Sequence, residues 1–420
     1  MFQSLLVRNY RLFATGQLVK LIGSWMMFIA QDWLVLHLTD NSASALGIVT
    51  ALQFVPAALL TLPGGRLADR HDKRVLLLSA NGLWSVLALS FSALILLGDV
   101  QLWHIYVFAL GLGIAQAIET PVRQSFVSEL VGTSLLPNAL SLSAATFNTA
   151  RIIGPALAGL AIAAFGTGPV FLIAAVSSLS PLLGLYRMRP AELHRKELPP
   201  WDDRSDARIL DGLHYAWKRA DLRLPMLMMG IIGMSAFNFQ ITLAALAKTV
   251  FHTGAATFGL FTTALAVGAL GGALAGTVRK GRPSAYVMLG AAIAFSAFAI
   301  GVGLAPAFWM VIILLVPTGF FMVYFAQAAN QRVQLGTEAA YRGRVMALYV
   351  LVFLGTAPVS SPIVGWLAEH LGAGASIWLG AVVSLATALA GLVWQLRHAN
   401  HRLELRVRPT PRLIVSQARG

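Results

Sequence analysis

Twelve long apolar runs, separated by short polar segments, dominate the chain. They lie near residues 13–38, 43–66, 75–97, 102–122, 137–165, 169–188, 223–250, 256–278, 284–305, 307–331, 344–368 and 373–396. A transmembrane helix needs about 20 consecutive apolar residues, so each run is long enough to cross a bilayer. The pattern predicts an all-α integral membrane protein with twelve transmembrane helices.

The polar segments alternate in charge along the chain. No lysine or arginine lies in segments 39–42, 98–101, 166–168, 305–306 and 369–372, whereas segments 66–74, 187–223, 279–282, 332–344 and the tail from 397 are rich in them. Cytoplasmic loops of membrane proteins carry the excess of Lys and Arg. The second set is therefore expected on the cytoplasmic side, together with both termini.

The longest polar stretch divides the apolar runs six and six. We predict an N-terminal six-helix half at 1–187, a cytoplasmic linker at 188–222, a C-terminal half at 223–397 and a basic cytoplasmic tail at 398–420. Helical spacing of apolar residues in the linker predicts an amphipathic helix with Ser205 as a plausible N-cap. Its apolar residues are Ile209, Leu210, Leu213, Ala216, Trp217 and Ala220. The helix either lies on the inner leaflet or is a connector without lipid contact.

Short patterns in the first half recur in the second at a constant offset of 207 residues. The pairs are Gly65-x-Leu67-Ala68 with Gly272-x-Leu274-Ala275, and Pro155 with Pro362. Two related six-helix halves with a site at their interface are typical of transporters. The sequence therefore predicts two pseudo-symmetric halves.

Composition narrows the possible functions. The chain is 57% hydrophobic and 11% charged, it carries a net charge of +14, and it has no cysteine. The positive charge follows the membrane topology, so we expect no nucleic-acid partner. Nucleotide-binding glycine loops, H-E-x-x-H metal motifs and cysteine ligands are missing from the sequence. We expect no enzyme activity, no metal and no cofactor.

A basic turn between the second and third apolar runs carries a long motif. Its residues are Gly65, Leu67, Ala68, Asp69, Arg70, Lys73, Arg74 and Leu77. Gly65 and Asp69 share one helix face, so a neighbouring helix can come close and meet the carboxylate with its positive end or an arginine. The motif resembles the signature loop of the major facilitator superfamily, except that Asp72 stands where the family usually has glycine.

The resemblance extends over most of the chain. Within the superfamily, the chain resembles the drug, macrolide and enterobactin exporter branch. This resemblance rests on Gly16-Gln17, Gly23-Ser24-Trp25-Met26, Trp33-Leu34-Val35-Leu36, Ala45-Leu46-Gly47, the segments 120–127 and 148–159, and Arg342-Gly343-Arg344-Val345-Met346. It implies a monomeric secondary transporter of a bacterial cytoplasmic (inner) membrane. Such a transporter exports small drug-like molecules or siderophores by proton antiport and alternating access. An importer or uniporter of a small metabolite or lipid, or a membrane sensor or scaffold, would use the same fold.

Three ionisable residues within the predicted spans are candidates for coupling protons to substrate. Asp32, Arg151 and Glu119 each place a charge where an isolated charge is costly. Asp32 is the expected proton or cation site, and Arg151 either pairs with it or contacts an anionic substrate. A fourth charge, Lys20, is expected to extend its ammonium group to the cytoplasmic surface.

Further residues complete the predicted machinery. Arg123 is the first expected partner of Asp69 in a cytoplasmic gate with Gly65, Arg70 and Arg74, and the helix that begins after Arg344 is the second. Gly154, Pro155 and Gly159 resemble the antiporter motif of helix 5 and would permit close packing or bending. Polar residues that would either line a cavity or join helices are Gln31, Asn238, Gln240, Tyr324 and Gln327.

Overall fold

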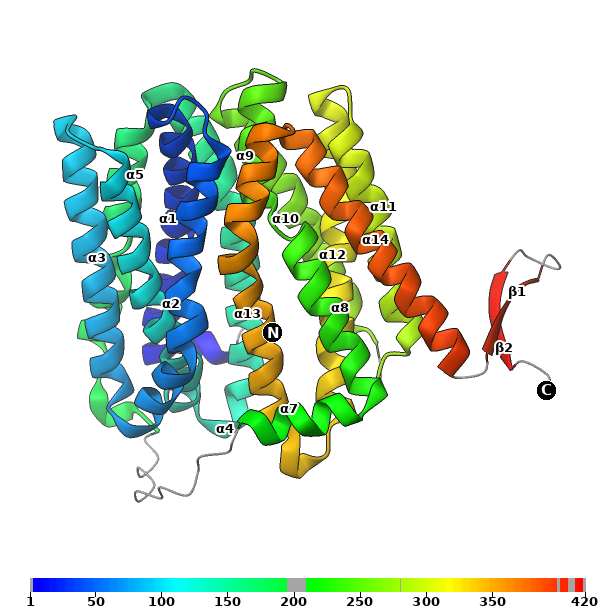
Figure 1. Cartoon of the computed structure of the whole chain (residues 1–420). Coiled ribbons are helices and arrows are strands. Elements are labelled where there is room, and N and C mark those ends of the chain that lie inside the picture. The colour runs from blue at the N-terminus through cyan, green and yellow to red at the C-terminus, as the bar shows by residue number, and fades with distance from the viewer. Residues whose placement is uncertain (1–2, 195–208, 280, 399–400, 407–411, 418–420) are drawn as a thin grey trace.

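The computed structural model describes residues 3–194, 209–279, 281–398, 401–406 and 412–417 (Figure 1). Side chains at 61–62, 64–66, 68–69, 133, 209–212, 339–340, 398 and in the C-terminal strands lie outside the described part. Within the described residues, twelve helical segments are long and apolar enough to cross a membrane. The predicted all-α fold of twelve spans is confirmed.

The first half contains six membrane-spanning segments. Its elements are the short 3-10 helix Gln3–Leu6, α1 (Arg8–Leu38), α2 (Ala43–Arg70), α3 (Lys73–Leu97), α4 (Leu102–Phe165), α5 (Thr167–Ser177) and α6 (Ser180–Arg187). The ribbon of α4 comprises two spans joined at Gly132, whose φ of 68° interrupts the helix. Helix therefore continues almost through residues 123–136, which separate the apolar runs 102–122 and 137–165.

The second half repeats this arrangement after a linker helix. Its elements are α7 (Ile209–Lys218), α8 (Ala220–Ala236), α9 (Phe239–Ala245), a π-helical turn (Leu246–Val250), α10 (Ala255–Thr277), α11 (Ala285–Leu304), α12 (Phe308–Gly336), α13 (Ala339–His370) and α14 (Ala373–His398). The chain continues into an antiparallel hairpin of β1 (His401–Arg406) and β2 (Arg412–Gln417), in which His401 faces Gln417. The linker helix is thus present at the predicted apolar segment, while Ser205 lies outside the described residues.

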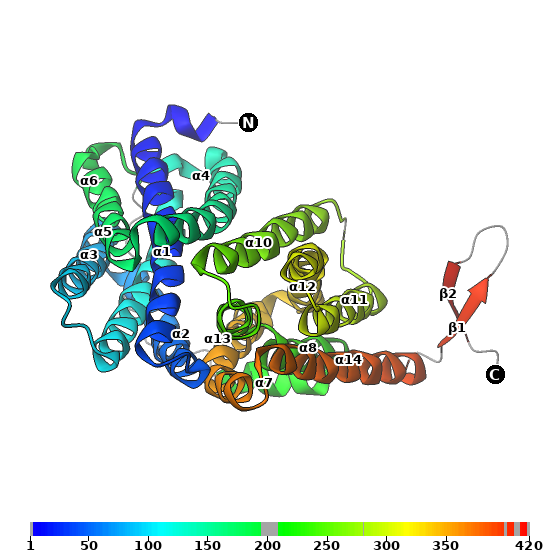
Figure 2. The same ribbon diagram turned by 90° about the horizontal axis from the view of Figure 1, so that it is seen from above.

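The two halves lie side by side, with α2 against α13 and α4 against α10 (Figures 1 and 2). α7 lies across one end of the helices, which we call the α7 end. We call the opposite end, where α1 turns into α2 and α13 turns into α14, the Glu369 end.

The internal repeat explains how the halves meet. At Gly47 of α2, an added Cβ would lie 2.4 Å from the carbonyl oxygen of Ser361, next to Pro362 of α13. At Gly259 of α10, an added Cβ would lie 2.5 Å from the carbonyl oxygen of Pro155 in α4. Each repeated proline therefore lies where its helix touches a glycine of the other half, and only glycine permits that backbone approach.

A hydrogen-bonded contact also joins the halves at the Glu369 end. The Glu369 carboxylate of α13 accepts hydrogen bonds from Ser42 Oγ at 2.7 Å and from the backbone N–H of Ser44 at 2.8 Å. These donors form the first turn of α2, where the helix dipole favours a negative charge. Together with the glycine contacts, this bond holds the halves together at this end.

We expect Glu369→Ala to weaken this contact and separate the halves at the Glu369 end. Loss of about 1–2 kcal/mol changes the ratio of two conformations by a factor of about 5–30. The chain has no cysteine, so spin labels on cysteines introduced at exposed Leu38 and Leu371 would report the distance without background. Glu369→Gln, which keeps one acceptor oxygen, is the matched control and should shift the distance less. An unchanged distance distribution in Glu369→Ala would show that the glycine contacts suffice.

Candidate substrate cavity and coupling residues

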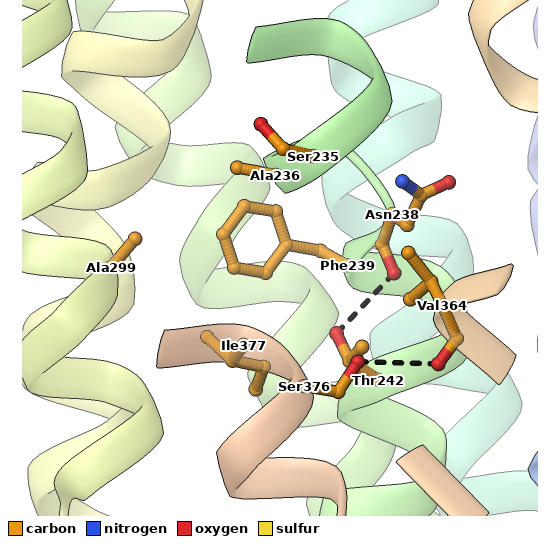
Figure 3. Close-up of a pocket in the computed structure, with 9 residues that line it drawn as sticks. All are labelled: Ser235, Ala236, Asn238, Phe239, Thr242, Ala299, Val364, Ser376 and Ile377. Carbon is orange, nitrogen blue, oxygen red and sulfur yellow. Dashed lines mark hydrogen bonds between the residues drawn. The ribbon is translucent and has the colours of Figure 1, made fainter. Parts of the chain in front are cut away.

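The seventh span breaks in the middle of the membrane. α8 ends at Ala236 and α9 begins at Phe239, so Phe237 and Asn238 leave the helical path. Figure 3 shows this break, where the Thr242 hydroxyl donates to the Asn238 carbonyl oxygen at 3.3 Å. The Asn238 side chain accepts from Ser360 of α13 at 3.1 Å. The second bond ties the break to α13, and broken helices are tolerated beside a transporter site where neighbouring helices supply such contacts.

A cavity of about 140 Å³ lies beside this break, between the two halves. It is lined by Trp25, Phe28 and Ile29 of α1, Arg151 of α4, Phe237, Phe239, Gln240 and Leu243 around the break, Thr262 and Leu265 of α10, and Met322 of α12. The wall is mostly aromatic and aliphatic, with a few polar groups. That combination is typical of small-molecule sites.

Arg151 is the ionisable residue of the cavity wall. Its guanidinium carbon lies 5.9 Å from the centre of the Trp25 ring. Among the described residues it has no ion-pair partner, so of the two alternatives for Arg151 the pairing with Asp32 is not found. An arginine remains protonated in proteins. The cavity wall is therefore positively charged.

Asp32 pairs instead with a residue of the other half. Its Oδ2 accepts a hydrogen bond from Nε2 of Gln240 at 2.8 Å, which joins α1 to α9. The side chain is only 1% exposed, and its Oδ1 has no hydrogen-bond partner among the described residues. Because Gln240 also lines the cavity, one amide connects the buried carboxyl group with the place where a ligand would bind.

The other predicted polar residues are distributed around this centre. Gln31 is fully buried beside Asp32, and Asn238 lies at the helix break. Gln327 lines a second cavity of about 460 Å³ between α12 and α13, toward the α7 end. Tyr324 lies on the same helix, with the Arg279 guanidinium 4.3 Å over its ring. The polar residues thus follow a path from the break toward the α7 end.

A cluster of buried charges lies within the first half. Glu119 of α4 lies 3.1 Å from Nε of Arg123 and 3.7 Å from Nζ of Lys20 in α1. The Lys20 ammonium donates to Asn81 Oδ1 of α3 at 2.7 Å, and Gln17 donates to Glu119 at 3.4 Å. Lys20 is 5% exposed, so the expectation that it reaches the membrane surface is wrong. Its charge is balanced inside the half, which the sequence did not indicate.

The signature motif is described in part. α2 extends through Asp69 to Arg70, so the turn shrinks to His71 and Asp72. The carboxylate of Asp72 accepts from the backbone N–H groups of Arg74 and Val75 and caps α3. This departure from the family pattern is therefore a helix N-cap. The side chain of Asp69 and the surroundings of Gly65 lie outside the described part, so the expected pairing of Asp69 with Arg123 stays a prediction.

The remaining motif residues have structural contacts. Arg74 donates to the carbonyl oxygen of Leu185 at 3.0 Å, while Arg70 is exposed at the α7 end. Gly154 lies directly beneath Trp25, where an added Cβ would be 2.4 Å from the Trp25 Cβ. Gly159 contacts the backbone of Ala255 in α10. The antiporter-like motif of Gly154, Pro155 and Gly159, which lies in the second span of α4, is therefore between the cavity and the contact of the halves.

Some residues of this region carried no usable signal in the sequence. Phe237 and Phe239 belong to the apolar run 223–250, and Glu369 stands at the start of the short polar segment 369–372, although the structure includes it in α13. An aromatic wall becomes visible only when helices from both halves are brought together. No group of three or more histidine or carboxylate side chains that could hold a metal ion is found in the described part of the chain.

Comparison with known proteins places this geometry in a family. The family model described as "Transmembrane secretion effector" matches residues 2–419. The match covers almost the whole chain, so the chain belongs to this family of major facilitator transporters.

Characterised relatives of this chain are transporters. It is 26% identical over 373 residues to the staphyloferrin A transporter of Staphylococcus aureus (strain NCTC 8325 / PS 47), covering 86% of this chain and 89% of the relative. It is 24% identical over 386 residues to the multidrug efflux pump Tap of Mycolicibacterium fortuitum, covering 88% and 91%. It is 26% identical over 298 residues to the enterobactin exporter EntS of Citrobacter koseri, covering 68% of each.

Solved structures support the fold. A POT family transporter in complex with a thioalcohol-conjugated peptide has a TM-score of 0.74 at 12% identity and covers 93% of this chain and 96% of that chain. An inward-facing bacterial homologue of the human lysosomal transporter Spinster has a TM-score of 0.68 at 14% identity, covering 92% and 94%. Together, the family and the relatives define a bacterial inner-membrane transporter of small molecules and not an enzyme.

Proposed function

We propose that this protein exports small organic molecules from the cytoplasm in exchange for protons. Its relatives include proteins named as an enterobactin exporter and a multidrug efflux pump. The observation that carries the proposal is the hydrogen bond between Asp32 of one half and Gln240 of the other, because Gln240 also faces the cavity. Proton binding and ligand binding would thus act on the same amide group.

The proposed orientation in the bilayer rests on charge, and the side that is closed rests on the contact of the halves. The positive-inside rule assigns the α7 end to the cytoplasm, with both termini on that side. The halves meet at the Glu369 end through Ser42, Ser44 and Glu369, so the present conformation would be closed to the outside. Alternating access would break these contacts and close the α7 end instead. Asp69 and Arg123 remain our proposal for the contact at that end.

The coupling mechanism derives from the hydrogen-bonding capacity of one amide. An ionised Asp32 accepts from the Gln240 N–H and so fixes the amide, which leaves the Gln240 carbonyl oxygen for a ligand donor. A protonated Asp32 donates its own O–H, which favours the reversed amide with its oxygen toward Asp32. The cavity then loses the acceptor that held the ligand. A proton on Asp32 and a substrate group that donates to the Gln240 oxygen therefore exclude one another, which antiport requires.

The cavity wall indicates which substrates fit. Arg151 supplies a positive charge that no described residue neutralises, and Trp25, Phe28, Phe237 and Phe239 supply aromatic surface. An apolar or aromatic molecule with an anionic group complements both features. Drug-like acids and siderophores belong to that chemical class.

We expect Arg151→Gln to weaken binding of anionic substrates. A hydrogen bond to a charged group contributes about 1.5–3 kcal/mol, so the affinity should fall roughly 10- to 100-fold. Tryptophan fluorescence titration in detergent would measure it. Arg151→Lys keeps the charge and is the matched control, and a neutral macrolide should bind all three proteins alike. Equal loss for neutral and anionic compounds would indicate damage to the cavity and no charge recognition.

A transport assay tests the proposal as a whole. Purified protein in liposomes with an internal pH-sensitive dye and an imposed pH gradient would receive catecholate siderophores, macrolides and lipophilic cations in turn. Substrate-dependent proton movement is the expected result. Substrate transport without proton movement would identify a uniporter, and no transport or binding of any compound would favour a sensor or scaffold.

A further inference from the structure

Two apolar grooves lie on the outer surface of the second half, one on each side of α8. The groove toward α14 has a volume of about 440 Å³, and the groove toward α13 about 290 Å³. The first is walled by Leu224 and Met228 of α8 with Ala390 and Gly391 of α14. The second is walled by residues of α7, α8 and α13, including Leu213, Met234 and Leu348.

The two grooves share one set of residues. Trp217 of α7 and Arg223, Leu227 and Ile231 of α8 line both of them. The last three are spaced by four residues and form a ridge along α8. Arg223 is at the α7 end of this ridge, and the grooves run from it toward the middle of the membrane. One cationic group therefore lies where the two apolar grooves meet.

The charge of Arg223 is not balanced by any residue that the structure describes. Two nearby arginines have carboxylate partners, because Asp221 lies 3.0 Å from Arg219 and 2.7 Å from Arg282, and Glu338 lies 3.6 Å from Arg219. Arg223 contacts the Trp394 ring, with its guanidinium carbon 5.9 Å from the ring centre. Among the described residues it has no ion-pair partner. Its donors remain for an external anion.

We propose that this surface binds one anionic diacyl phospholipid. The phosphate would lie on Arg223 between Trp217 and Trp394, and each groove would hold one acyl chain. Tryptophan is typical of the headgroup level of a bilayer, and arginine there attracts anionic lipid. The exposed surfaces of Trp217, Leu227 and Ile231 need apolar cover, which acyl chains provide. Two apolar grooves that meet at one cation fit a lipid with two acyl chains better than a single-chain lipid or a soluble anion.

Such a lipid would connect the linker to the second half. Leu213, Ala216 and Trp217 lie on α7, while the other lining residues lie on α8, α13 and α14. A bound lipid would thus fill the space between the linker helix and three helices of one half. None of its lining residues lines the cavity at Arg151, and the site does not depend on the proposed transport reaction.

Native mass spectrometry of the purified full-length protein tests this site. The protein would be incubated with phosphatidylglycerol or phosphatidylcholine of identical acyl chains. We expect one phosphatidylglycerol to be retained severalfold more than phosphatidylcholine, and we expect Arg223→Gln to remove this preference. Arg11→Gln is the matched control, because Arg11 is exposed on α1, away from both grooves, and its loss changes the net charge equally.

Two further measurements separate the lipid from other anions and from misfolding. Ala390→Phe would narrow the groove beside α14 and should lower retention while Arg223 is intact; size-exclusion profiles would confirm that each variant is folded. Displacement of the lipid by soluble glycerol phosphate would show that the site recognises the phosphate alone. That result would overturn the proposal that the two grooves hold acyl chains. Equal retention of the two lipids, or unchanged retention in Arg223→Gln, would also overturn it.

Discussion

Replacing Asp32 with asparagine should reduce substrate-driven proton movement in proteoliposomes to the background of empty liposomes. Asparagine has nearly the shape of aspartate, and its carbonyl oxygen can still accept the hydrogen bond from Gln240. It cannot bind and release a proton. The contact between the halves would therefore survive while the exchange of a proton for a ligand would not. The internal pH-sensitive dye gives the measurement.

The controls for this variant separate coupling from binding. Exchange of labelled for unlabelled substrate without a pH gradient should continue in Asp32→Asn, since it needs the cavity and the movement of the halves but no proton. Asp99→Asn removes an exposed carboxylate and should behave as the wild type. Proton movement that persists in Asp32→Asn would assign the coupling role to Glu119. Loss of both proton movement and exchange would indicate that Asp32 is needed for the conformational change itself.

Much of the fold could be predicted because the bilayer restricts what a sequence can form. Apolar runs of sufficient length must become helices there, and the alternation of basic loops predicts the orientation of each helix in the membrane. The offset between Pro155 and Pro362 predicted two related halves, and both prolines lie at equivalent contacts between them. Local signals of this kind are carried by single segments, so they are readable without tertiary structure.

The site was predictable only as a set of unusual residues. Asp32 and Arg151 stand out in the sequence as charges within apolar runs, but their pairing does not. Nothing in the order of residues reveals that Asp32 bonds to Gln240, 208 positions away, while Arg151 faces an aromatic wall. The break at Phe237–Asn238 was missed for a similar reason. It is stabilised by Ser360 on another helix and has no proline or glycine to mark it.

The two groups of buried charges have different places in the molecule, and this predicts different roles. Asp32 and Gln240 belong to opposite halves, so their bond changes when the halves move. Glu119, Lys20 and Asn81 belong to one half, on α4, α1 and α3. Contacts within a rigid half need not change during alternating access. We therefore expect the Asp32 pair to affect transport and the Glu119 cluster to affect stability.

Replacing Glu119 with glutamine should destabilise the protein strongly. The variant leaves the Lys20 ammonium and the Arg123 guanidinium near each other without a counter-charge, and Lys20 is almost completely buried. Removal of one partner from a buried ion pair typically costs about 3–5 kcal/mol, because the other charge remains in a medium that solvates it poorly. Thermal unfolding in detergent should show a clearly lower Tm.

The double variant Lys20→Met with Glu119→Gln decides whether the unbalanced charge is the cause. Methionine fills a volume similar to that of the lysine stem without its charge, so most of the lost stability should return. Arg123 then remains beside a neutral amide in place of the Glu119 carboxylate, but its side chain is partly exposed and can be solvated. A single variant as stable as the wild type would show that the Lys20 charge is already neutralised in another way. An unstable double variant would instead assign the effect to lost packing among α1, α3 and α4, and rigidity of the first half would then depend on the shape of the cluster and not on its charge.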